Sequence, residues 1–151
     1  MKIVLTGISA TPYAREYISN AAQTLRQRGH QVFVPHEGGW SAPEKPAAAN
    51  LFDFESTFQA LQEADLMMAI LDGYSVDDAV ATQVGIFYTL ARLGEKKRQM
   101  IGILHDTRVA GWSWNGEDKA LAPQVRQCIH TYGKVYPNLS KAMSALEQKA
   151  E

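Results

Sequence analysis

Hydrophobic and polar positions along the chain follow two periods, one typical of buried strands and one typical of amphipathic helices. Short apolar runs bounded by Gly, Pro or charged residues predict buried strands at 2–6, 31–34, 66–71, 99–104 and 134–136. Apolar residues at helical spacing predict helices over 13–28, 51–63, 78–93 and 119–131, and a last helix that Ser140 caps.

Strands and helices therefore alternate along most of the chain. This order predicts an α/β fold, a three-layer sandwich of the flavodoxin or Rossmann type with a five-stranded, mostly parallel sheet. No repeat or linker divides the 151 residues, so we expect residues 1–151 to form a single domain. Ligands of such sheets bind at the carboxyl ends of the strands. The candidate ligand-binding loops are therefore those at 7–13, 36–50, 72–78 and 105–115.

The composition narrows the classes of partner. The formal net charge is −1, so no overall field attracts nucleic acid or an anionic membrane. The single cysteine, Cys128, excludes an internal disulfide and a cysteine-based zinc site. The histidines that follow strands, His36 and His105, lack partners at ligand spacing, so we expect no metal and no cofactor. No apolar run has the length of a signal peptide or membrane span, which favours a cytoplasmic protein.

Three carboxylates, those of Asp72, Asp77 and Asp78, surround the start of the helix predicted at 78–93. Asp at a helix N-terminus satisfies free backbone N–H groups, which is the ordinary explanation for Asp78 taken alone. Three carboxylates exceed what capping needs, so we expect at least one of them to bind a ligand hydroxyl.

The loop after the first strand is a second candidate. Gly7 and Ser9 lie in a glycine- and hydroxyl-containing turn before a helix N-terminus, a place where backbone N–H groups bind sugars or phosphates. Tyr13 is able to stack on a base. An ordinary strand-to-helix turn explains these residues about as well.

The segment 76–85, Val-Asp-Asp-Ala-Val-Ala-Thr-Gln-Val-Gly, resembles the signature D-x-G-T-x-x-E-x-G-x-A of the nucleoside 2-deoxyribosyltransferase family. That family includes enzymes that hydrolyse the N-glycosidic bond of nucleoside monophosphates. The Glu-Ala-Asp before the third strand and the pair Asp106 and Arg108 extend the resemblance. It implies a small-molecule nucleoside or nucleotide as substrate, with Gly85 and Asp106 among the substrate-binding residues.

Two positions depart from the family pattern. Gln83 aligns with the glutamate that acts as nucleophile in the family, and Thr57 occupies the place of an acidic residue near the base. One interpretation is a divergent enzyme that exchanges the base or hydrolyses the N-glycosidic bond, in which another carboxylate acts. Asp77 is the first candidate for that role and Asp72 the second. The other is a catalytically inactive nucleoside- or nucleotide-binding protein in which Gln83 hydrogen-bonds the sugar.

Alternatives remain beside these two. Taken alone, Gln83 is equally typical of an exposed helix position, and a flavodoxin-like module of unrelated function has the same pattern of elements. The helix at 78–93 is apolar on more than one face, which predicts a partner helix from a second copy in a homodimer. The family resemblance implies the same assembly.

Overall fold

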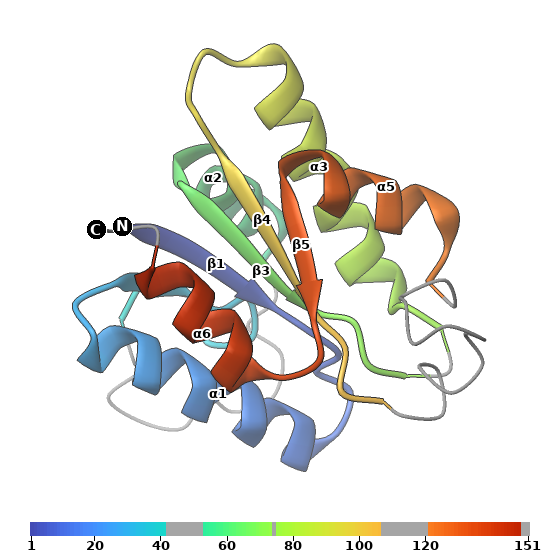
Figure 1. Cartoon of the computed structure of the whole chain (residues 1–151). Coiled ribbons are helices and arrows are strands. Elements are labelled where there is room, and N and C mark those ends of the chain that lie inside the picture. The colour runs from blue at the N-terminus through green and yellow to red at the C-terminus, as the bar shows by residue number, and fades with distance from the viewer. Residues whose placement is uncertain (42–52, 74, 107–120, 149–151) are drawn as a thin grey trace.

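The computed structural model describes residues 1–41, 53–73, 75–106 and 121–148. Its centre is a five-stranded sheet that carries helices on both faces (Figure 1). In chain order the elements are β1 (Lys2–Thr6), α1 (Pro12–Gln27), β2 (Gln31–Phe33), α2 (Phe54–Glu63), β3 (Leu66–Ile70), α3 (Asp78–Leu93), β4 (Gln99–Ile103), α5 (Pro123–Tyr132), β5 (Gly133–Tyr136) and α6 (Leu139–Glu147).

All strand pairs are parallel, in the order β2-β1-β3-β4-β5. The register pairs Ile3 with Leu66 and Leu66 with Gln99, so neighbouring strands end near the same level. The strand order reverses direction between β1 and β3. This edge of the sheet, at the carboxyl ends of β1 and β3, is the place where the fold offers a crevice for a ligand.

Two apolar layers hold the helices on the sheet. On one face, α1 and α6 pack over the sheet through residues such as Leu25 and Met143, and on the other α2, α3 and α5 pack through residues such as Leu61, Phe87 and Ile129. Figure 1 shows α1 and α6 in front of the sheet, and the other helices behind it. All five residues of β3 are buried, which is why this strand has no polar alternation.

The structure confirms the predicted fold class, and the helix predicted at 78–93 has the bounds of α3. The strand predicted at 2–6 also has the bounds of β1, the other elements shift by one to a few residues, and the predicted starts at 51 and 119 lie outside the described residues. The prediction that Ser140 caps the last helix is wrong. Asn138 is the cap, because its side chain accepts a hydrogen bond from the Lys141 N–H at 2.9 Å, and Ser140 lies inside α6.

Candidate functional site

A groove opens between the N-terminal halves of α2 and α3, which lie on the same face of the sheet. It encloses about 190 Å³. The lining positions fall three or four residues apart on each helix, so each helix contributes one stripe of its surface. Of the described residues, those that line it are Phe54, Thr57, Phe58 and Leu61 from α2, and Asp78, Ala79, Thr82, Gln83 and Ile86 from α3.

Gln83 and Thr57, which both line this groove, each carry a buried polar atom without a partner among the described residues. Both side chains are buried, and 5% of Gln83 and 3% of Thr57 is exposed. Neither the Oε1 of Gln83 nor the Oγ1 of Thr57 has a hydrogen-bond partner among the described residues. A buried polar atom without a partner costs about 1–3 kcal/mol. Two such atoms in one groove are therefore an arrangement that a bound hydroxyl or amide group relieves.

The burial of Gln83 excludes its interpretation as an exposed helix residue. Gln83 and Thr57, the two positions at which the family resemblance predicts acidic residues, thus line one groove although they lie on different helices. Both side chains are uncharged. The groove therefore offers hydrogen bonds at these two positions and no negative charge from either.

Asp77 and Asp78 have different surroundings in spite of being neighbours. Asp77 is the N-cap of α3, and its Oδ1 accepts hydrogen bonds from the N–H groups of Ala79 at 3.0 Å and Val80 at 3.3 Å. Asp78 occupies the first turn and lines the groove. Asp77 is therefore the cap, while Asp78 has the first-turn position in which a carboxylate interacts favourably with the helix dipole. Among the described lining residues, Asp78 supplies the carboxylate.

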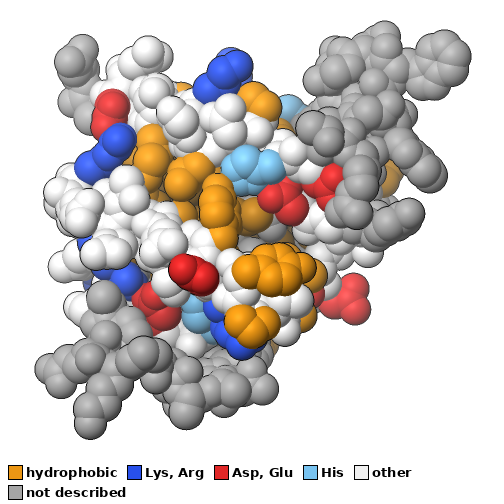
Figure 2. All heavy atoms as spheres, turned by 90° about the horizontal axis from the view of Figure 1, so that it is seen from below, with side chains coloured by type: hydrophobic (Ala, Val, Ile, Leu, Met, Phe, Trp, Pro, Cys, Tyr) orange, Lys and Arg blue, Asp and Glu red, His pale blue; other side chains and the backbone are white. Residues whose placement is uncertain are grey.

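Asp72 joins the ends of β3 and β4. Its Oδ1 accepts hydrogen bonds from the backbone N–H groups of His105 at 2.6 Å and Asp106 at 3.0 Å, and its Oδ2 lies 2.8 Å from His105 Nδ1. The Nε2 of His105 in turn lies 2.9 Å from the Tyr17 hydroxyl. Figure 2 looks onto this end of the molecule and shows a histidine beside acidic and hydrophobic side chains.

The predicted residues of the first loop do not line the groove. A Cβ added at Gly7 would lie 3.0 Å from the Ile70 Cβ and 3.1 Å from the Ile18 Cδ1, so close packing of α1 against β3 favours glycine here. The Ser9 carbonyl accepts a hydrogen bond from Arg15 at 2.7 Å. The roles predicted for Gly7 and Ser9 in substrate binding stay predictions.

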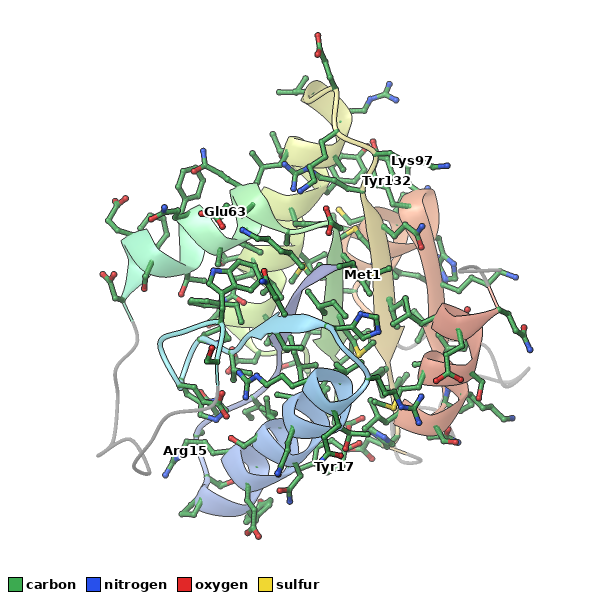
Figure 3. The ribbon with its side chains drawn as sticks, turned by 90° about the vertical axis from the view of Figure 1, so that its left-hand side faces the viewer. Met1, Arg15, Tyr17, Glu63, Lys97 and Tyr132 are labelled. Carbon is green, nitrogen blue, oxygen red and sulfur yellow. The ribbon has the colours of Figure 1, made fainter. Side chains whose placement is uncertain are left out.

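Tyr13 and Gly85 also lie away from the described lining. Tyr13 is 74% exposed near the start of α1, and Gly85 has open space where a Cβ would stand. Figure 3 places the neighbouring residues Arg15 and Tyr17 at the end of the molecule opposite Lys97. Because strand β4 begins just after Lys97, this is the carboxyl end of the sheet.

Burial changes the titration of two groups near this end. Burial, and to a smaller degree the nearby Asp72 carboxylate, raises the pKa of the Tyr17 hydroxyl. Burial lowers the pKa of His36, whose Nε2 lies 3.1 Å from the Ser19 hydroxyl oxygen. Among the described residues, no group of three or more His, Cys, Asp or Glu side chains is placed to hold a metal ion.

Sequence reasoning missed the aromatic wall of the groove and the position of Tyr17. Phe54 and Phe58 stack with ring centroids 6.2 Å apart and planes within 7°. Phe54 remains 54% exposed. The sequence shows only that Phe54, Thr57 and Phe58 have helical spacing, and the tertiary position of α3 shows that they line one groove with Gln83.

The chain belongs to the nucleoside 2-deoxyribosyltransferase family, because the model of that family matches residues 5–124. No curated protein sequence matches the chain. In the described part of the chain, no helix has the length and apolar character needed to span a membrane.

Solved structures share the fold at low sequence identity. A conserved protein from Enterococcus faecalis V583 is 17% identical with a TM-score of 0.74, and the match covers 99% of this chain and 98% of that one. The Clostridium botulinum CMP N-glycosidase BcmB is 14% identical with a TM-score of 0.57, over 98% and 99% of the two chains. The TIR domains of the Roq1 resistosome are 10% identical with a TM-score of 0.57, over 99% and 98%.

Proposed function

We propose that this protein binds a nucleoside or nucleotide in the groove between α2 and α3 without forming a covalent bond to its sugar at Gln83. The observation that carries the proposal is the pair of unpaired polar atoms on Gln83 and Thr57. A sugar hydroxyl that donates to the Gln83 Oε1, with a second polar group at the Thr57 hydroxyl, satisfies both. Family membership supplies the class of ligand.

The absence of charge at Gln83 is the reason for proposing binding rather than turnover. A carboxylate nucleophile attacks the anomeric carbon and stabilises the positive charge that develops there in the transition state. The amide of Gln83 is neutral, so it neither attacks the anomeric carbon nor stabilises the positive charge there. Loss of one such electrostatic contribution lowers the rate by about two to three powers of ten or more.

The size of the groove suggests how much of the ligand it takes. Its volume of about 190 Å³ lies below the roughly 300–1,000 Å³ of most small-molecule sites. We infer that the described groove holds one part of the nucleoside, the sugar, against Gln83. The stacked rings of Phe54 and Phe58 offer an apolar surface to a flat base beside it.

A second candidate function is cleavage or exchange of the N-glycosidic bond with Asp78 as the acting carboxylate. The observation in its favour is that Asp78 lines the same groove as Gln83. Asp77, which the sequence favoured, caps α3 through its Oδ1 and is not among the described residues that line the groove. Asp78→Asn separates the two functions, because it abolishes cleavage by this route and leaves the Gln83 amide available to bind the sugar.

The experiment is a ligand panel measured for binding and for turnover at once. Nucleosides, deoxynucleosides and their 5′-monophosphates, CMP included, are titrated by calorimetry, and each mixture is then analysed for free base with and without an acceptor base. Saturable binding with no free base supports the proposal. Base release that Asp78→Asn abolishes supports the second candidate, and binding to none of the panel contradicts both.

The assembly and the location stay predictions. We propose that residues 1–151 act as a single domain in the cytoplasm and form a homodimer through α3, whose Leu93 is 80% exposed. Light scattering that finds only monomer at micromolar concentration contradicts the dimer.

A further inference from the structure

Three side chains from different parts of the chain form a continuous hydrogen-bonded series outside the groove. Tyr17 comes from α1, Asp72 follows β3, and His105 follows β4. The Tyr17 hydroxyl lies 2.9 Å from His105 Nε2, and His105 Nδ1 lies 2.8 Å from Asp72 Oδ2. The two rings meet edge to face, with centroids 5.5 Å apart and planes at 89°.

The donors and acceptors of this series have one consistent assignment. An ionised carboxylate only accepts hydrogen bonds, so the hydrogen of a neutral His105 lies on Nδ1, toward Asp72. The lone pair then lies on Nε2, and the Tyr17 hydroxyl donates to it. Asp72 is held in turn by the backbone N–H groups of His105 and Asp106, which bind its other oxygen.

We propose that Tyr17 is a nucleophile, with His105 as its general base and Asp72 as the positioning residue, in a second reactive site at the carboxyl edge of the sheet. The order of hydroxyl, imidazole and carboxylate, and their separations, are those by which a base activates a weak nucleophile. In the reacting step, Tyr17 Oη forms a bond to the electrophilic atom, its proton passes to His105 Nε2, and the leaving group departs with the electrons of its bond.

The electrostatics select the substrate class and explain why a base is needed. The Asp72 carboxylate lies two hydrogen bonds from the reacting oxygen and repels anions, so the site favours uncharged electrophiles such as neutral esters and sulfonyl compounds over phosphates. The raised pKa of Tyr17 keeps its hydroxyl protonated at neutral pH. The hydroxyl therefore reacts when His105 takes the proton during attack, and not through a standing phenolate.

Tyr13 provides a matched control on the same helix. It is 74% exposed, against 40% for Tyr17, and none of the described residues hydrogen-bonds its hydroxyl. If solvent exposure of the hydroxyl alone governs its reaction with an electrophile, Tyr13 reacts faster than Tyr17. If His105 activates Tyr17, the order reverses.

The test is modification of the full chain with phenylmethylsulfonyl fluoride, which loses fluoride to form a stable sulfonate ester, followed by peptide mass mapping over time. We expect Tyr17 to be modified at least about tenfold faster than Tyr13, since a positioned general base contributes about 10²–10⁴ in rate. Equal modification, or faster modification of Tyr13, overturns the proposal.

Asp72→Asn isolates the role of the carboxylate. Its Oδ1 still accepts from the backbone N–H groups of His105 and Asp106, so the loop is retained, but its amide donates to His105 Nδ1 and moves the ring hydrogen to Nε2. We expect ¹⁵N NMR to show this change of tautomer, and Tyr17 modification to fall to the rate of Tyr13. A folded Asp72→Asn protein with the changed tautomer and an unchanged Tyr17 rate overturns the proposal, as does an unchanged rate in His105→Gln.

Discussion

Replacement of Gln83 by methionine should stabilise the free protein while removing its ability to bind a ligand in the groove. Methionine has nearly the same length and shape as glutamine and carries no carbonyl oxygen. The Gln83 Oε1 is buried without a partner, and such a group costs about 1–3 kcal/mol in the folded state. The groove is open on one side, so we take the lower part of that range and expect about 1 kcal/mol of added stability.

The assay is urea denaturation of the free protein, supported by thermal melting. A gain of about 1 kcal/mol corresponds to a rise in Tm of about 2–4 °C for a chain of this size. The matched control is Gln59→Met on α2, because Gln59 is exposed and should change the stability by less than about 0.5 kcal/mol. A loss of about 1 kcal/mol or more in Gln83→Met would show that Gln83 stabilises the fold through hydrogen bonds, and would contradict an unpaired Oε1.

Three further predictions concern stability away from the groove. Arg98 donates hydrogen bonds to three carbonyls at the C-terminal end of α2, at 2.6–3.1 Å. Arg98→Ala should therefore lower the unfolding free energy, measured by urea denaturation, by about 1–3 kcal/mol, and an unchanged value would contradict this capping role. The Glu37 side chain is 5% exposed and pairs with Arg26 at 2.8 Å, so Arg26→Met, which leaves that carboxylate unpaired, should cost about 3–5 kcal/mol of unfolding free energy. Adding Glu37→Gln to this variant should recover part of the lost stability, and no recovery would argue against a charge effect. Burial lowers the pKa of His36 below its unfolded value, so its contribution is fully present above about pH 6.5 and declines as the pH falls toward the folded pKa. Unfolding free energies at about pH 7.5 and about pH 5.5 should therefore differ less in His36→Asn than in the wild type, and an equal difference would contradict the assignment.

The fold was predictable because its signals are local. The period of the apolar residues and the length of each apolar run identify the strands and helices. The helix α3 has its predicted bounds because Asp77 precedes and Gly94 follows one continuous apolar pattern. Of the residues predicted for the site, Asp78 and Gln83 line the groove, and both lie in the segment 76–85 that carries the family resemblance.

The partners of individual side chains were not predictable, because they depend on tertiary positions. Two adjacent aspartates compete for the cap of α3, and only the backbone at Asp77, with φ −56° and ψ 139°, decides that Asp77 caps and Asp78 faces the groove. A glutamine within a helix is typical of an exposed position, and only the tertiary arrangement shows that Gln83 is buried beside residues of α2. Tyr17 and His105 are 88 positions apart in the sequence, and patterns of residue spacing predict contacts only between residues close in sequence.

The most direct test of the central claim is an NMR titration that follows the side-chain amide of Gln83 while the ligand panel is added and free base is monitored in the same tube. We expect at least one nucleoside or nucleotide to shift the Gln83 amide resonances saturably, with no base released. Binding that leaves these resonances unchanged, or release of free base by the wild-type protein, would contradict binding without turnover at Gln83.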